Sequence, residues 1–253
     1  DLTVMQNSLL YSLLQAVSHN ISHRNINLRL FDIGRIYLPG DPPYEEEKIG
    51  ITVTGKANDY WYSKGRDFDF YDLKGAIDTL LKLSRISPVE YSTSDHFSLE
   101  ETCSFELILN DRNVGYIGQI KQSILRQFDI KQNVLAAVLD FRTLLENIEP
   151  ESTYQSLPRF PAAPRDMAVV VDETVKVGSL LDEIKQTGGP LLEKVELFDL
   201  FTGKQVGEGK KSIAFSMIYR SREKSLESDE VNNVHNRIAD NLNKKFKAQI
   251  REA

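Results

Sequence analysis

The stretch VELFDLFTGKQVGEGKKSIAFSMIY (195–219) decides the fold of the carboxyl-terminal half of the chain. Its two ends are rich in the β-branched and aromatic residues that favour strands, and amphipathic patterns flank it. The predicted elements, in chain order, are a strand at Met167–Val171, a helix at Val177–Gln186, strands at Val195–Phe201 and Ser212–Tyr219, a helix at Ser228–Phe246 and a strand at Ala248–Arg251. This βαββαβ order is typical of a ferredoxin-like sandwich, in which two helices cover one face of a four-stranded sheet. The other face stays open, and aromatic and basic side chains on such a face can hold nucleic-acid bases.

Composition and length bound the class of protein. The 253 residues have the make-up of an ordinary globular protein and are enough for two domains. No apolar run is long enough to span a membrane and no signal-peptide pattern opens the chain, so we predict a cytoplasmic protein without a membrane partner. The single cysteine, Cys103, excludes an internal disulfide and fits a reducing compartment. Metal-ligand spacing is not evident among the four histidines, His19, His23, His96 and His235, so no metal site is predicted.

The charge is modest and unevenly spread. The formal net charge of −6 argues against a generally cationic nucleic-acid binder and leaves no reason to expect a DNA partner. The acidic excess falls in residues 1–149, whereas residues 150–253 are neutral overall and locally basic at 204–224 and 237–251. Such local basic surface suits a limited contact with a polyanion.

A proline-rich segment, Asn147–Pro164, divides the chain, which predicts two domains at 1–149 and 150–253. The first half mixes strands and helices, so the fold class is α+β with an antiparallel sheet. Asp41–Glu47 is predicted to be an acidic turn, and Asn110–Asp111 the turn of a hairpin. The predicted helices cover Met5–Val17 and Phe70–Leu83, and the predicted strands cover Leu28–Tyr37, Ile49–Gly55, Phe105–Leu109, Val114–Gln119 and Leu135–Asp140.

Six stretches in order resemble one family. They are NSLLYSLLQAVSHN (7–20), LRLFDIGRIY (28–37), DFYDLKG (69–75), PRFPAAPRDMAVVVDE (158–173), LFDLFTGKQVGEGKKSIAF (197–215) and LESDEVNNVHNRIADNLNKKF (226–246). Together they resemble the carboxyl-terminal part of the β subunit of bacterial phenylalanyl-tRNA synthetases. Because the first residue is not Met, we expect a piece of a longer protein.

This resemblance implies a fold and a division of labour. It implies a class II synthetase-like antiparallel sheet domain that has lost catalysis, followed by a ferredoxin-fold anticodon-binding domain. In that family the active enzyme is an α2β2 tetramer. Its α subunit uses ATP and magnesium to activate phenylalanine and then charges tRNA-Phe. The resemblance therefore implies the α subunit and tRNA-Phe as partners, with no cofactor held by this chain.

The same resemblance points to residues that contact tRNA. On the alternating strand FDLF (198–201), it places Asp199 and Phe201 on the open face, where a carboxylate can accept from a guanine edge and a ring can stack. Ser212 and Phe215 should lie on opposite faces of their strand. The full predicted tRNA-binding set is Arg165, Asp199, Phe201, Lys211, Ser212 and Arg251.

No catalytic residue is predicted in the first half. Arg29 and Arg35 occupy the strand that holds the ATP α-phosphate in active class II enzymes, but GYIGQIKQ (115–122) lacks the arginine of their later glycine-rich motif. Asp69 and Asp72 are interpreted as helix caps. The opening helix, with leucines on more than one face, has two open interpretations: a buried core helix, or packing at the α–β subunit interface.

We therefore predict a non-catalytic fragment that supports subunit assembly and binds the tRNA anticodon region. One alternative is a ferredoxin-like regulatory or interaction module that does not bind RNA. A second is a hydrolase in the first half, which would need convergent carboxylates or histidines that the sequence does not display.

Overall fold

We analysed a computed structural model of the chain, which describes residues 4–57, 62, 64–86, 89–149, 157–203 and 205–251. The chain divides into two compact units, residues 1–153 and 154–253, close to the boundary expected from the proline-rich segment. Each unit has hydrophobic core packing of its own.

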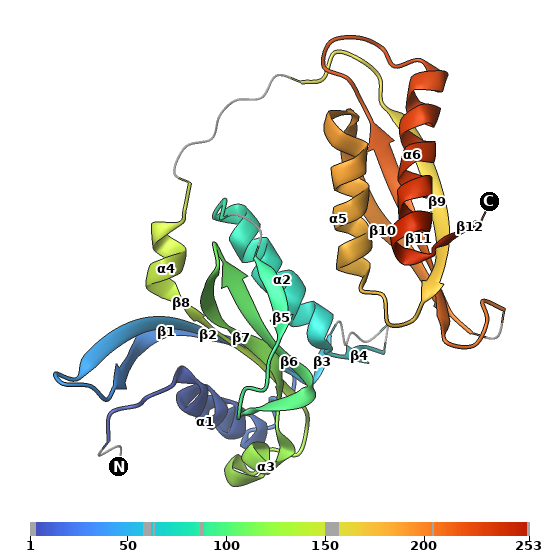
Figure 1. Ribbon diagram of the computed structural model, residues 1–253. Coiled ribbons are helices and arrows are strands. Elements are labelled where there is room, and N and C mark those ends of the chain that lie inside the picture. Colours follow the sequence, from blue (N-terminus) through green and yellow to red (C-terminus); the bar gives the residue numbers. More distant parts are fainter. Residues whose placement is uncertain are drawn as a thin grey trace. The chain divides into compact units, whose positions relative to one another are not determined.

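The first unit is built on a six-stranded sheet in the order β1-β2-β8-β7-β6-β5, in which every neighbouring pair is antiparallel (Figure 1). This confirms the predicted α+β class with an antiparallel sheet. Its elements are α1 (Leu9–Ser22), β1 (Leu28–Leu38), β2 (Tyr44–Thr54), β3 (Lys56–Ala57), β4 (Arg66–Asp67), α2 (Phe70–Leu83), β5 (Glu90–Thr93), β6 (Leu99–Leu109), β7 (Arg112–Ile120), α3 (Gln122–Leu125), η1 (Arg126–Phe128), β8 (Val134–Asp140) and α4 (Phe141–Glu146).

Helices cover both faces of this sheet. On one face α1 packs Leu10, Leu14 and Val17 into a core, and on the other α2 packs Leu73 and Ile77 into a second core. Central strand β8 (VLAAVLD) is buried along nearly its whole length because it contributes side chains to both cores. The core interpretation of the opening helix therefore accounts for its leucines within this unit.

Local chemistry fixes the ends of these elements. Asp69 caps α2 by accepting from the backbone N–H groups of Tyr71 and Asp72, and the Asp72 carboxylate accepts from the backbone N–H of Asp69. Asn110 and Asp111 have positive φ angles of 49° and 61°, as a tight two-residue hairpin turn requires. Both predicted features are confirmed.

The predicted acidic turn at Asp41–Glu47 is partly wrong. Strand β2 begins at Tyr44, and Glu45 and Glu47 lie within it. Their carboxylates pair with Arg35 on β1 at 3.2 and 3.6 Å. Cross-strand ion pairs of this kind allow a run of acidic residues to occupy a strand.

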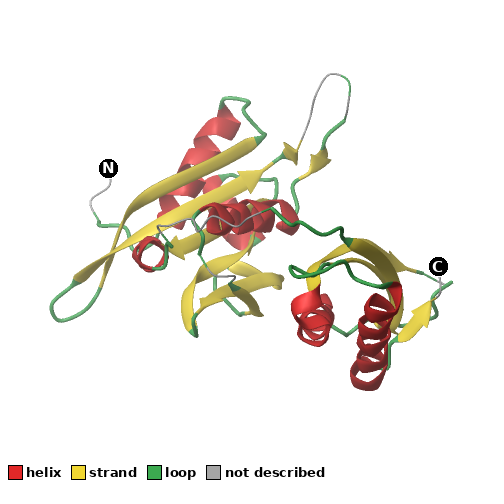
Figure 2. Cartoon of the chain, turned by 90° about the horizontal axis from the view of Figure 1, so that it is seen from above, coloured by secondary structure: helices red, strands yellow, loops and turns green. Residues whose placement is uncertain are grey.

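The second unit is a four-stranded antiparallel sheet in the order β10-β11-β9-β12. Helices α5 and α6 lie side by side against one face of it (Figure 2). The predicted ferredoxin-like βαββαβ order is confirmed. The elements are β9 (Ala163–Asp172), α5 (Val177–Gly188), η2 (Gly189–Leu191), β10 (Leu192–Thr202), β11 (Lys210–Tyr219), α6 (Ser228–Phe246) and β12 (Gln249–Arg251).

Candidate nucleic-acid interface

Alternation along β11 identifies the open face of the second sheet. Ile213, Phe215 and Met217 are completely buried in the core formed with α5 and α6. Ser212 and Ala214 alternate with them and therefore lie on the opposite, open face. Ser212 and Phe215 are thus on opposite faces, as predicted.

Strand β10 brings the two central residues of the predicted site to that open face. Its register pairs Phe201 with Ser212 and Asp199 with Ala214. Phe201 is 45% exposed, so a face of its ring is available for stacking. The structure therefore places Asp199, Phe201 and Ser212 together on the uncovered side of the sheet.

A β-bulge makes this placement possible. The register shifts between Leu197 and Asp199, which leaves Phe198 as the extra residue. Before the bulge Leu197 pairs with Phe215, and after it Leu200 pairs with Ile213, so both leucines are on the helix side. Leu197 and Leu200 are nevertheless 39% and 48% exposed, and β10 is an edge strand of the sheet.

Two residues of the predicted set lie on the other side of the sheet. Arg165 pairs with Met217 in the register of β9, and its Nη2 donates to Oδ1 of Asn232 on α6 at 3.3 Å. Lys211 alternates with Ser212, and its Nζ donates to the carbonyl oxygen of Glu173 at 2.9 Å. Strand alternation is the physical reason that these two do not share a surface with Asp199 and Phe201. The parity of Arg165 with the apolar Met167 is the signal in the sequence for this separation.

Arg251 is placed only by its backbone. It pairs with Ala168 of β9, which in turn pairs with Ala214 and, through it, lies in the same cross-strand row as Asp199. The side chain of Arg251 lies outside the described parts of the chain.

Several residues of the open face were missed in the sequence. Small side chains occupy its centre, which allows a flat ring to approach the sheet closely. Gln249 pairs with Val170, in the row that contains Ser212 and Phe201. Besides the predicted residues, the face contains Asp166, Ala168, Val170, Glu196, Ser216 and Gln249. These residues come from separate segments of the chain, so only the strand register shows that they share one face.

The electrostatics of the open face are mixed rather than basic. Asp166, Glu196 and Asp199 lie on it, and Lys194 is paired with Glu196 at 2.7 Å. At one end of the sheet, hydrogen bonds from Thr174, assisted by Lys210 and Lys211, lower the pKa of Asp172. Binding here would depend on stacking and hydrogen bonding more than on charge.

A partly buried polar cluster joins α6 to β11 behind the open face. The Tyr219 hydroxyl lies 3.1 Å from Nδ1 of His235. Burial raises the pKa of Tyr219 to about 12, and burial together with the charge of Arg165 lowers the pKa of His235. Arg165 thus belongs to the contact between β9 and α6.

In the first unit the singled-out arginines already have partners. The Arg29 guanidinium lies 4.7 Å from the centre of the Phe68 ring, and Arg35 is paired with two glutamates. Neither is an unengaged phosphate ligand.

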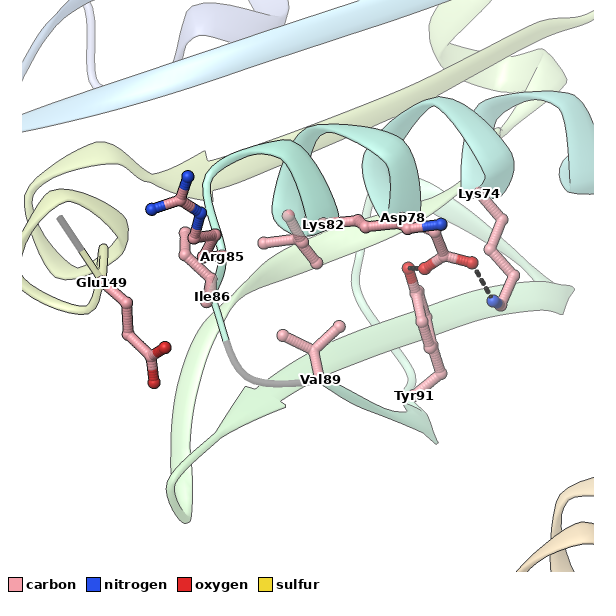
Figure 3. Close-up of a pocket in the computed structure, with 9 residues that line it drawn as sticks. Lys74, Asp78, Lys82, Arg85, Ile86, Val89, Tyr91 and Glu149 are labelled. Carbon is pink, nitrogen blue, oxygen red and sulfur yellow. Dashed lines mark hydrogen bonds and ion pairs between the residues drawn. The ribbon is translucent and has the colours of Figure 1, made fainter. Parts of the chain in front are cut away.

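A hollow of about 680 Å³ lies between α2 and β5 (Figure 3). Within it Asp78 accepts hydrogen bonds from the Tyr91 hydroxyl at 2.7 Å and from Lys74. Burial and the bond to Asp78 raise the pKa of Tyr91 far above its ordinary value. Asp78 therefore has a structural role between two donors, and this arrangement does not resemble an acid–base site.

The residues that the structure describes include neither a multi-ligand metal cluster nor a membrane-spanning helix. No group of three or more histidine, cysteine, aspartate or glutamate side chains is arranged to hold a metal. No described helix has the length and apolar character needed to cross a membrane.

Comparison with known proteins adds the family. The model of the phenylalanyl tRNA synthetase beta chain CLM domain matches residues 1–141, and that of the ferredoxin-fold anticodon binding domain matches residues 158–251. Phenylalanine–tRNA ligase beta subunits from Bacillus cereus, Clostridium tetani and Bacillus subtilis are 34%, 33% and 32% identical over 97%, 99% and 98% of this chain. The chain covers 31%, 31% and 32% of those proteins, or about a third of their length. It therefore belongs to the phenylalanyl-tRNA synthetase beta subunit family, as a part of that subunit that includes a ferredoxin-fold anticodon-binding domain.

Proposed function

We propose that the second unit binds the anticodon region of tRNA-Phe through the open face of its sheet. The observation that carries this proposal is the placement of Asp199 and Phe201 side by side on the face that α5 and α6 leave uncovered. Single-stranded RNA is recognised in this way, because unstacked bases offer both a flat ring and a free edge.

Each residue of the face has a distinct role in this proposal. The Phe201 ring stacks on a base, and the Asp199 carboxylate accepts from the N–H donors of a base edge. The Ser212 hydroxyl, next to Phe201, supplies a hydrogen-bond donor or acceptor for a base. Arg251 supplies positive charge for the phosphates of the RNA backbone. Arg165 and Lys211 act from outside the face by holding α6 and the turn after β9 in place.

The first unit is proposed to be a non-catalytic, class II-like scaffold that contacts the α subunit in an α2β2 enzyme. Phe31 and Ile33 support a protein contact, because they are 72% and 48% exposed on the edge strand β1. Activation of phenylalanine with ATP and magnesium, and the charging of tRNA, belong to the α subunit in this proposal. The whole assembly is proposed to be cytoplasmic.

Titration of the 253-residue chain with tRNA-Phe and with an anticodon-altered tRNA, each at two salt concentrations, tests the RNA contact. We expect tighter binding of the unaltered tRNA at both salt concentrations. Phe201→Ala should weaken that binding by about 1–3 kcal/mol, the usual cost of losing one base–aromatic stack. Asp199→Asn should reduce the discrimination between the two tRNAs.

Matched variants provide the controls. Phe97→Ala removes an exposed ring from the first unit, and Asp182→Asn removes an exposed carboxylate from α5, so both should bind like the parent chain. Equal affinity for the two tRNAs would leave only nonspecific charge. Absence of binding at both salt concentrations would favour the interaction module without RNA binding.

A further inference from the structure

The last turn of α1 brings two histidines together on the protein surface. His19 and His23 are four residues apart, so the helix places them on one face, with their ring centres 4.4 Å apart. Both side chains are exposed. No metal site was predicted from the sequence. On a helix, however, two imidazoles four residues apart can bind the same metal ion.

A hydrogen bond orients one of these rings for ligation. Nδ1 of His23 lies 2.8 Å from the carbonyl oxygen of His19. A carbonyl oxygen can only accept, so in this bond Nδ1 is the donor, with the Ser22 hydroxyl also 3.2 Å away, and in the neutral ring Nε2 is the nitrogen left for ligation. Metal-binding histidines usually have this second contact, which fixes the tautomer and the direction of the ring.

The surroundings leave room for water. A polar hollow of about 580 Å³ adjoins His19 and lies between α1 and η1. Gln15, Ser18 and Asp129 are among the polar side chains that line it. Water molecules bound to a cation at His19 would therefore find hydrogen-bond partners.

We propose that His19 and His23 chelate one divalent transition-metal cation, with water completing its coordination. Imidazole donors suit Cu²⁺, Ni²⁺ and Zn²⁺, and the general order of affinity places Cu²⁺ first. The described residues provide no cluster of three or more ligands, so binding is weaker than at a four-ligand structural site. This site lies in the first unit, whereas the open face that is proposed to bind RNA belongs to the second unit.

Equilibrium dialysis of the 253-residue chain against Ni²⁺ at pH 7.5 tests the site. We expect one bound ion per chain, and a loss of affinity of about tenfold or more in His19→Gln and in His23→Asn. The double variant His23→Asn, Gln15→His restores a pair at four-residue spacing one turn earlier, since Gln15 is exposed on the same face. It should regain most of the lost affinity.

A second readout needs no variant. Ni²⁺ at millimolar concentration should raise the midpoint of thermal unfolding of the parent chain by about 2 °C at pH 7.5. Unchanged affinity in either single variant would place the metal elsewhere and overturn the proposal. So would a parent chain that binds no Ni²⁺ at millimolar concentration, or a double variant that stays as weak as His23→Asn.

Discussion

Glu183 joins the two helices of the second unit through a contact that depends on its charge. The residue is only 6% exposed, and its carboxylate accepts from Lys245 on α6 and from the Thr187 hydroxyl at 3.0 Å. The bond from Lys245 lowers the pKa of Glu183, and the resulting stabilisation is complete above the unfolded value of about 4.3 and lost as the pH falls through the folded value. We expect Glu183→Gln to reduce the free energy of unfolding by about 1 kcal/mol at pH 7, measured by urea denaturation.

Between pH 7 and pH 3 the difference between Glu183→Gln and the parent should shrink, because the stabilising carboxylate is lost as the pH falls through the lowered folded pKa. Asp182→Asn, on the exposed side of the same helix, should change the stability by less than about 0.5 kcal/mol at either pH. A penalty for Glu183→Gln that is the same at pH 3 and pH 7 would show that packing, not charge, is responsible.

His235 predicts a second pH dependence at higher pH. Burial and the nearby Arg165 lower its pKa, so the unfolded chain takes up the proton first. The stability of the second unit should be complete above about pH 6.5 and should fall as the pH drops through the folded pKa. We expect His235→Gln to flatten this slope between pH 7 and pH 5, as measured by amide exchange of α6.

His96 provides the matched control because burial also lowers its pKa, but in the first unit, where its ring stacks on Tyr116 at 3.8 Å. His96→Gln should leave the slope of α6 exchange unchanged. If the slope survives in His235→Gln, another group of the second unit must titrate in this range.

Strand β10 shows, at the scale of an element, what the sequence can and cannot predict. Regular alternation would place Val195, Leu197, Asp199 and Phe201 on one face, whereas the bulge at Phe198 moves the last two to the other. The alternation within FDLF can be predicted from the sequence. The bulge cannot, because it depends on pairing with the separate strand β11. Resemblance to relatives, rather than periodicity, therefore placed Asp199 and Phe201 correctly.

Helix α2 is the element whose pattern translates most directly into energy. Ile77 is completely buried against the sheet, whereas Leu83, at the end of the same helix, is 78% exposed. We expect Ile77→Ala to lower the free energy of unfolding of the first unit by about 2–5 kcal/mol, because it leaves a cavity. Leu83→Ala, measured in the same urea titration, should cost less than about 0.5 kcal/mol. Equal losses would mean that the two side chains are buried alike in solution.

At the scale of the whole molecule, long periodic elements were predictable and short or pairing-dependent ones were not. The apolar stripes of α2 and α6 and the hairpin at Asn110 follow from local chemistry. Helices α3 and α4 and strand β5 have four to six residues each, too few for a period to emerge. The composition of the open face was also out of reach, because it depends on the register of four strands.

The proposed division of labour between the subunits predicts that this chain alone cannot activate phenylalanine. Adenylation requires groups that neutralise and orient a triphosphate, and the arginines on β1 are already engaged: Arg29 by the Phe68 ring and Arg35 by Glu45 and Glu47. ATP–pyrophosphate exchange with ATP, magnesium and phenylalanine should therefore remain at the level of a protein-free blank, with an intact phenylalanyl-tRNA synthetase in the same assay as the positive control. Exchange that follows this chain through purification and falls in Arg29→Ala would make the first unit a working active site instead of a scaffold.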